Sequence, residues 1–174
     1  VGDSEVTRNL VDHVRQGSLG EGPVLISGER GTGKELVARL IHFHSARSGQ
    51  PFDSIELGAL PNERIPMELF GTEKGASEPI EERPGRIEIV RGGTLFLDGV
   101  EKLPVERQGA LLEVIRNQNL RRVGGSRDIP VSARILVGTT GALSQQVQAG
   151  LFSKELFARL SQTTLHIPPL RTRG

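Results

Sequence analysis

Short apolar runs alternate along this chain with segments whose apolar residues recur every three or four positions. Apolar runs with the length and composition of buried strands lie at residues 23–27, 95–98 and 134–138. Residues 52–56 alternate apolar and polar as a strand does, and residues 163–167 form a final predicted strand. The periodic segments have the spacing of an amphipathic helix, and they begin near residue 4, at Lys34, at Glu106 and at Lys154. This alternation predicts an α/β fold, with a doubly wound, mostly parallel sheet and helices on both faces.

The predicted topology brings the ends of several strands together. Right-handed crossovers place the carboxyl ends of parallel strands on one edge of the sheet, where ligands usually bind in such folds. We therefore expect Ser27, Asp98 and Gly138 to lie on one rim. Residues 73–85 are polar and contain two prolines, so we expect them to form an exposed loop.

Composition narrows the class of protein. The 174 residues are 36% hydrophobic and 25% charged, as in an ordinary globular domain, and 22 basic residues nearly cancel 21 acidic ones. This balance gives no sign that the segment grips nucleic acid by itself, and no apolar run approaches the ~20 residues of a membrane span. The absence of cysteine excludes disulfides and thiol chemistry. With no signal-peptide pattern, it predicts a cytoplasmic protein.

The strongest local motif follows the first predicted strand. It reads GERGTGK and consists of Gly28, Glu29, Arg30, Gly31, Thr32, Gly33 and Lys34, which is the spacing of a phosphate loop. Such a loop turns backbone N–H groups and the positive end of the next helix toward phosphate oxygens, while its lysine reaches the terminal phosphates. Glu35 follows, where the general pattern has a Ser or Thr that ligates magnesium. We therefore expect ATP or ADP here, with Mg2+ held largely by Asp98 and bound water.

A second motif ends the third predicted strand. The segment GGTLFLDGV delivers Asp98, as nucleotide-hydrolysing folds deliver a metal-binding carboxylate, but the next residue is Gly99 instead of the usual second acid. Glycine has no side chain that can accept a proton from the attacking water. The loss of a positioned base typically slows a reaction on the order of 10²–10⁴-fold. Glu101 lies two residues further on, but its place in a turn leaves open whether it faces the phosphates.

Longer blocks extend these motifs over nearly the whole chain. They read GERGTGKELVARLIH, ELFGTEKGA, PGRIEIVRGGTLFLDGV, LLEVIRNQNLRRVGGSRDIPVSARILVGTT, LFARL and IPPLRTRG. In this order they resemble the central AAA+ ATPase domain of bacterial sigma-54-dependent transcription activators (enhancer-binding proteins), whose phosphate loop typically reads GESGTGKE. The resemblance implies a homo-oligomer, from dimer to hexamer, that acts on RNA polymerase holoenzyme. It makes residues 1–174 the nucleotide-binding core, with a helical lid and a separate DNA-binding domain expected beyond residue 174.

The resemblance also assigns roles to single residues. It makes Asp98 the magnesium-coordinating acid and Thr139 the sensor that contacts the γ-phosphate or the water. Arg159 is the remaining candidate for an arginine finger, which acts across a subunit interface and is typically worth roughly 10³–10⁵ in rate; the alternative is an arginine on a helix surface. Arg86 and Arg122 match basic positions near the subunit contact.

Departures from the family pattern bear on function. The family's sigma-contact tip reads GAFTGA, whereas residues 75–80 read GASEPI, and a charged, proline-stiffened tip argues against sigma-54 engagement by the family's route. Gly99 replaces the water-activating Glu, and Ser153 replaces the first of two arginines in the family's FRxDLxxRL motif. Glu56 stands where the family has Asn. It is either a displaced acid near the phosphates or an exposed carboxylate at a strand end.

Two further groups of polar residues suggest no additional chemistry. His42 and His44 have no third metal-type ligand at suitable spacing, so we expect them on a helix surface rather than on zinc. Asp53 and Glu56 occupy uneven faces of one strand, so we do not expect a pair of catalytic carboxylates.

Three functions remain open from the sequence. The first is an ATP-binding regulatory module of a transcription regulator, with hydrolysis weak or lost and no sigma-54 remodelling. The second is an active ATPase in which Glu56 or Glu101 replaces the missing acid. The third is an oligomerisation scaffold whose phosphate loop binds no nucleotide. The retained binding residues beside the altered catalytic ones favour the first.

Overall fold

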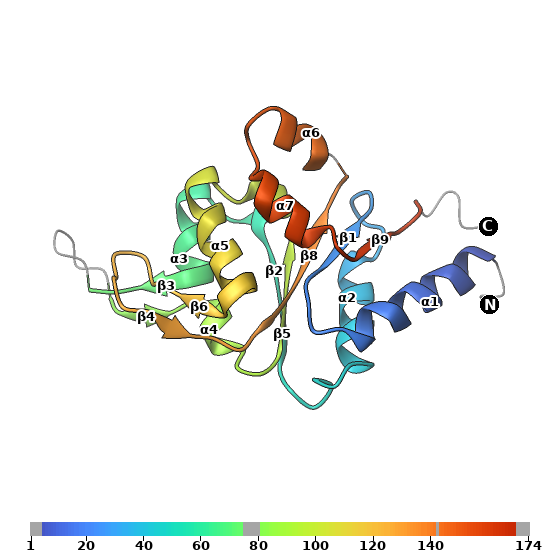
Figure 1. Ribbon diagram of the computed structural model, residues 1–174, viewed down its shortest axis with the longest axis horizontal. Coiled ribbons are helices and arrows are strands. Elements are labelled where there is room, and N and C mark those ends of the chain that lie inside the picture. The colour runs from blue at the N-terminus through green and yellow to red at the C-terminus, as the bar shows by residue number, and fades with distance from the viewer. Residues whose placement is uncertain (1–4, 75–80, 142, 170–174) are drawn as a thin grey trace.

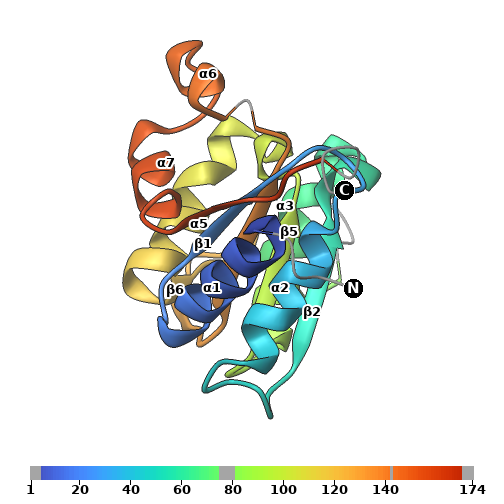
Figure 2. The same ribbon diagram turned by 90° about the vertical axis from the view of Figure 1, so that its right-hand side faces the viewer.

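Five parallel strands form the central sheet of the protein, seen in a computed structural model that describes residues 5–74, 81–141 and 143–169 (Figures 1 and 2). The strands are β1 (Val24–Ser27), β2 (Phe52–Glu56), β5 (Thr94–Asp98), β8 (Arg134–Thr139) and β9 (Thr164–His166). Their order across the sheet is β2-β5-β8-β1-β9, and every neighbouring pair is parallel. The predicted parallel α/β fold is confirmed.

Helices cover both faces of this sheet. They are α1 (Glu5–Leu19), α2 (Lys34–Phe43), α3 (Ile65–Phe70), α4 (Arg86–Ile89), α5 (Val105–Asn117), α6 (Leu143–Gln148) and α7 (Lys154–Leu160). Single 3-10 turns are η1 (Leu57–Ala59), η2 (Asn62–Arg64) and η3 (Val100–Lys102), and two small antiparallel hairpins pair β3 (Gly71–Thr72) with β4 (Arg83–Pro84) and β6 (Asn119–Leu120) with β7 (Ile129–Pro130). None of the helices in the described ranges has both the length and the apolar character that crossing a bilayer requires.

The core divides into two layers because successive strand residues point to opposite faces. Leu95 and Leu97 pack into the larger apolar cluster, with the helices from α3 to α7. Phe96, between them, packs into the smaller cluster with α1 and α2. All three side chains are fully buried, which explains why the strand reads as a continuous apolar run.

The carboxyl ends of the strands meet on one rim, as the sequence predicts. Asp98 lies in register with Glu56 on one side and with Gly138 on the other, and Ser27 lies beside Thr139. The loop after β1, the acid after β5 and the end of β8 are therefore neighbours in space. This rim positions the candidate site.

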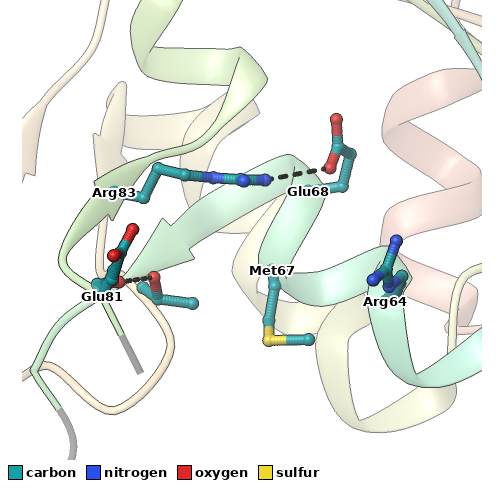
Figure 3. Close-up of a pocket in the computed structure, with 6 residues that line it drawn as sticks. Arg64, Met67, Glu68, Glu81 and Arg83 are labelled. Atoms are coloured by element: carbon teal, nitrogen blue, oxygen red, sulfur yellow. Dashed lines mark hydrogen bonds and ion pairs between the residues drawn. The ribbon is translucent and has the colours of Figure 1, made fainter. Parts of the chain in front are cut away.

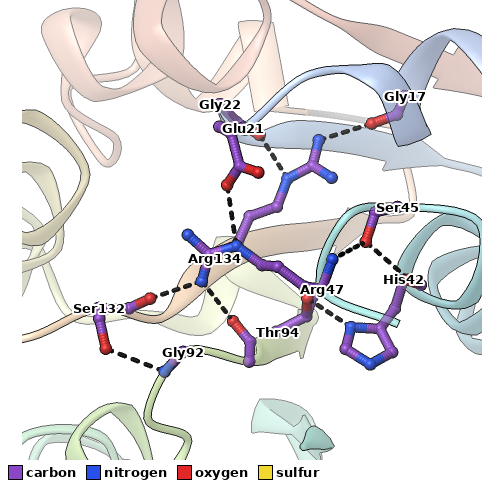
Figure 4. A network of polar contacts seen from close by, with 11 residues as sticks. Gly17, Glu21, Gly22, His42, Ser45, Arg47, Gly92, Thr94, Ser132 and Arg134 are labelled. Carbon is purple, nitrogen blue, oxygen red and sulfur yellow. Dashed lines mark hydrogen bonds and ion pairs between the residues drawn. The ribbon is translucent and has the colours of Figure 1, made fainter. Parts of the chain in front are cut away.

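A network of polar contacts joins helix ends, loops and strand starts away from this rim (Figure 4). The Arg134 guanidinium donates to the carbonyls of Gly17 (2.6 Å) and Gly22 (3.0 Å), and its side chain is buried. His42 lies nearby with no exposed surface, hydrogen-bonded to the Thr94 hydroxyl at 2.7 Å. The expectation that His42 lies on a helix surface is therefore wrong, because this ring is a core residue with polar partners.

His44, by contrast, is exposed, as predicted. The GASEPI segment at 75–80, on which the expectation about sigma-54 rests, lies outside the described residues, as do the last five residues of the chain.

Candidate nucleotide-binding site

The glycines of the phosphate loop are required by the local backbone. Gly31 and Gly33 have φ angles of +78° and +91°, in the left-handed region that favours glycine. Gly28 is required for a different reason, because a larger residue would clash. Its β-carbon would lie 2.7 Å from the Thr32 hydroxyl and 3.1 Å from the carbonyl oxygen of Ile167. The loop thus wraps closely over the start of α2, and the N-terminal end of a helix favours a bound anion.

Lys34 fills the centre of this loop. Its ammonium group donates to the carbonyls of Gly28 at 3.0 Å and Glu29 at 3.1 Å, and the residue is only 6% exposed. The Thr32 hydroxyl donates to the same Glu29 carbonyl at 2.7 Å. The loop therefore holds a buried positive charge next to the end of β5, where the terminal phosphates of a nucleotide would need it.

An open cleft of about 480 Å³ adjoins the loop. It brings together residues from the phosphate loop, the ends of β2 and β5, and the segment after β8, namely Arg30, Lys34, Glu56, Gly58, Asp98, Gly99, Glu101, Lys102, Thr140 and Gln146. Five of the residues named from the sequence (Arg30, Lys34, Glu56, Asp98 and Gly99) thus line one space, together with Glu101, which the sequence left open.

Asp98 is half-buried at the end of β5. Burial raises the pKa of its carboxyl group, the Lys34 ammonium lowers it, and the negative charges of Glu56 and Glu101 raise it again. Gly138 makes room for this carboxylate, because a β-carbon there would lie 2.8 Å from Asp98 Oδ1. Asp98 thus lies in one cleft with two further carboxylates, those of Glu56 and Glu101, and with the cations of Arg30, Lys34 and Lys102.

These residues fit a nucleotide with Mg2+. In the part of the chain that the structure describes, no three His, Cys, Asp or Glu side chains gather to form a complete metal site. Mg2+ on a nucleotide needs no such cage, because one or two carboxylates, phosphate oxygens and water usually complete its shell. Asp98, whose carboxylate has room beside Gly138 and lines the cleft together with Lys34, is the residue that would hold the ion.

Gly99 adopts a backbone conformation that other residues rarely take. Its φ and ψ are 82° and 44°, and its N–H donates to the Gly138 carbonyl at 2.9 Å. A β-carbon at this position would meet nothing closer than 3.7 Å, from the backbone nitrogen of Gly58. The cleft therefore has space for a side chain at position 99, but the left-handed turn disfavours one.

Glu35 and Asp53 are directed to partners outside the cleft. The Ser54 hydroxyl donates to Glu35 at 2.8 Å, and this bond, with a weaker contribution from Arg39, outweighs desolvation and lowers the pKa of Glu35. Asp53 pairs with Arg86 at 2.7 Å. Glu35 is therefore no direct substitute for a magnesium-binding hydroxyl in this structure, and Asp53 forms no pair with Glu56.

Thr139, which the resemblance makes the sensor, does not line the cleft, whereas its neighbour Thr140 does. Thr139 is buried; its carbonyl accepts from the Gly28 N–H at 3.1 Å and its hydroxyl from the Gly141 N–H at 3.4 Å. Thr140, the next residue, lines the cleft. Sequence reasoning missed Thr140 because the strand pattern alone does not say which of two adjacent threonines faces the ligand.

Ser153 and Arg159, the two positions that carry arginines in the family's FRxDLxxRL motif, lie at the N-cap of α7 and within α7, and neither lines the cleft. Arg159 is exposed and does not line it, so a role across a subunit contact stays a prediction. Ser153 is the N-cap of α7, where its hydroxyl accepts from the Leu156 N–H at 3.2 Å. The residue that replaces the family's first arginine thus stabilises the start of this helix.

The arginines predicted to lie near a subunit contact have partners within this chain. Arg122 is almost buried and forms two hydrogen bonds with Glu88, at 2.8 and 2.9 Å, which raise the pKa of the guanidinium. Arg86 bridges Asp53 and Glu68. These pairs hold α4 against β2, α3 and the segment after β6, so intermolecular roles for both arginines remain predictions.

A smaller pocket of about 230 Å³ lies beside the β3–β4 hairpin (Figure 3). Arg64, Met67, Glu68, Thr72, Glu81 and Arg83 surround it. Arg83 faces Glu68 across the pocket at 3.4 Å, and the Thr72 hydroxyl donates to the Glu81 carbonyl. Arg83 and Glu68 are paired with each other, and the phosphate loop is not among the residues that line this pocket, so it offers less chemistry than the cleft.

The fold and the cleft together define a P-loop nucleotide-binding domain. Residues 1–166 match the family described as the sigma-54 interaction domain. The chain belongs to this family, the AAA+ ATPase modules of bacterial sigma-54-dependent transcription regulators.

Individual relatives agree with this assignment. The chain is 42% identical over 174 residues to the response regulator protein PilR of Pseudomonas aeruginosa, covering 99% of this chain and 39% of that protein. It is 46% identical over 151 residues to the DNA-binding transcriptional regulator NtrC of Escherichia coli, covering 86% and 32%. The chain thus spans about two fifths or less of the length of these relatives.

Solved structures show the same fold. The crystal structure of NtrX from Brucella abortus in complex with ADP superposes with a TM-score of 0.91 at 35% identity, over 99% of this chain and 38% of that one. A second NtrX structure, in complex with ATP, gives the same TM-score and identity over 99% and 37%. The P-loop NTPase domain of a sigma-54 activator from E. coli, 21% identical with a TM-score of 0.68, supports the fold alone.

Proposed function

We propose that this domain is an ATP-binding AAA+ regulatory module of a bacterial transcription regulator in which ATP hydrolysis is weak or lost. One observation carries the proposal: the cleft keeps Lys34 and Asp98 in place, while the residue after Asp98 is a glycine in a left-handed turn. A site built in this way can bind phosphates, but it lacks the acid next to the metal-binding carboxylate. The NtrX structures with ADP and ATP support the choice of nucleotide.

The residues of this chain divide the work of binding. The N–H groups of the phosphate loop and the Lys34 ammonium bind the phosphates, for which Lys34 exchanges the Gly28 and Glu29 carbonyls for phosphate oxygens. Asp98 is the residue that would hold the metal ion. Bound Mg2+ would supply charge neutralisation at the phosphate oxygens.

The proposal extends to partners through the family. The named relatives are transcription regulators, which supports action on RNA polymerase holoenzyme and DNA contact through a separate domain. A homo-oligomer, from dimer to hexamer, would place Arg159 of one copy near the cleft of the next. The GASEPI sequence at 75–80 and the absence of an acid at position 99 both support a role without sigma-54 remodelling.

Two measurements on the protein test the proposal. Equilibrium titration with ATP, with and without Mg2+, is expected to show magnesium-dependent binding that Lys34→Ala removes. A phosphate-release assay on the same sample is expected to show turnover slower than a few per minute. Faster turnover would identify the active ATPase instead, and a folded sample that binds no adenine nucleotide would identify the scaffold.

A further inference from the structure

Glu101 holds a carboxylate oxygen without a partner at the edge of the cleft. It lies in η3, the 3-10 turn that follows Gly99, and it lines the cleft together with Asp98. One oxygen, Oε1, accepts from the Thr140 hydroxyl at 3.3 Å. The other, Oε2, is buried and has no hydrogen-bond partner, and it is the sole such side-chain oxygen or nitrogen among the residues that the structure describes.

A buried carboxylate oxygen without a donor is costly, because its lost hydration is not replaced. Such an atom in a fold is normally paired by protein or by ordered water. The residue lines the nucleotide cleft, so a change of its side-chain torsion can bring this oxygen to water that accompanies a bound nucleotide.

The turn at Gly99 directs Glu101 to this place. The left-handed conformation of Gly99 starts a turn that the Lys102 N–H closes by donating to the Gly99 carbonyl at 2.9 Å. Thr140, just after the end of β8, fixes the other side of the carboxylate. The negative charge of Glu101 is near enough to raise the pKa of Asp98, which agrees with a place beside the metal-binding acid.

We propose that Glu101 accepts the proton of the attacking water in the slow ATP hydrolysis of this domain, in place of the acid missing at position 99. In this step the water oxygen forms a bond to the γ-phosphorus, and the bond between that phosphorus and the β–γ bridging oxygen breaks. The bridging oxygen keeps the electron pair and leaves as part of ADP. One water proton passes to Glu101 and then to the released phosphate. The inference rests on the proposed function, because it assumes that ATP binds in this cleft.

Glu101 fits this role better than Glu56. The Glu56 side chain also lines the cleft, but the residue is exposed and water can solvate both of its oxygens. Glu101 is partly buried, is oriented by Thr140 and has its unpaired oxygen out of bulk water. A base held in this way stays positioned for one proton transfer.

A single-turnover experiment tests the inference, with trace radiolabelled ATP, Mg2+ and excess protein followed over hours. Glu101→Gln is expected to slow hydrolysis on the order of tenfold or more, while the Kd for ATP changes less than about threefold. Glu106→Gln removes an exposed acid from the first turn of α5 and is expected to keep the original rate. Gly99→Glu combined with Glu101→Gln is expected to recover hydrolysis, which a purely structural role of Glu101 would not allow.

Each outcome separates this inference from the proposed function. An unchanged rate in Glu101→Gln, or loss of the rate in Glu56→Gln alone, overturns the role of Glu101. A protein that binds ATP but releases no phosphate also overturns it, while leaving the proposed function intact. Fast turnover that depends on Glu101 would uphold the inference and refute the weak-hydrolysis proposal. A folded protein that binds no ATP refutes both.

Discussion

The variant Gly99→Glu tests whether the missing acid at position 99 limits ATP hydrolysis. The backbone conformation of Gly99 determines how much stability this substitution costs. Gly99 has φ near +82°, and a side chain in the left-handed region costs about 1–2 kcal/mol. The β-carbon itself would clash with nothing, since the nearest atom lies 3.7 Å away. We therefore expect Gly99→Glu to fold and to melt roughly 2–8 °C below the original protein.

The rate of ATP hydrolysis in Gly99→Glu must be compared with that of a variant that has the same backbone strain at position 99. Gly99→Ala introduces the β-carbon and the backbone cost without the carboxylate, so it is the matched control. We expect Gly99→Glu to release phosphate on the order of 10²-fold faster than Gly99→Ala, at the low end of the range for a positioned base. A continuous phosphate-release assay at saturating Mg2+ and ATP gives both rates.

Equal rates of ATP hydrolysis in the two variants, while both still bind ATP, would contradict this prediction. That result would mean that the absence of an acid at position 99 does not limit the reaction, and that the site is altered elsewhere. A melting temperature of Gly99→Ala equal to that of the original protein would contradict the calculated strain.

Three further substitutions test other parts of the structure. Gly138→Ala places a β-carbon 2.8 Å from Asp98 Oδ1, so we expect magnesium-dependent ATP binding to weaken about tenfold or more by calorimetry, while Gly109→Ala, with open space around it, leaves binding unchanged. Ser153→Ala removes the cap of α7 and is expected to cost about 1 kcal/mol in denaturant unfolding; no change in the midpoint would refute the capping role. Burial lowers the pKa of His42 in the folded protein. When the pH decreases below about 6.5, this imidazole therefore takes up a proton more readily in the unfolded chain than in the folded protein. As the pH decreases below about 6.5, the unfolding free energy should thus decrease by up to about 1.4 kcal/mol per pH unit. This slope should be smaller in His42→Gln.

The strand pattern predicted the architecture well because the sheet is buried on both faces. Leu95, Phe96 and Leu97 must all be apolar when helices cover each side, so the run is visible in the sequence. Parallel pairing then determines that Asp98 and the phosphate loop meet on one rim. The sequence therefore suffices to place Lys34, Asp98 and Gly99 together.

The surroundings of Glu101, His42 and Ser153 depend on details that the periodicity of the sequence does not encode. The direction of Glu101 follows from the left-handed turn at Gly99, and a glycine in a sequence does not reveal its φ angle. His42 looked like a surface residue because its helical position gave no hint of the Thr94 hydroxyl that satisfies it in the core. The sequence comparison treated Ser153 only as the replacement of an arginine and therefore did not predict that it caps α7.

The most direct test of the central claim is the identity of the nucleotide that the protein retains. The protein is incubated with ATP and Mg2+ for several minutes, passed rapidly through a desalting column and denatured, and the released nucleotide is separated by chromatography. Binding with weak hydrolysis predicts that most of the recovered nucleotide is ATP, in near-stoichiometric amount, and that Lys34→Ala recovers almost none. Recovery mainly of ADP, with phosphate released at each turnover, would contradict the claim.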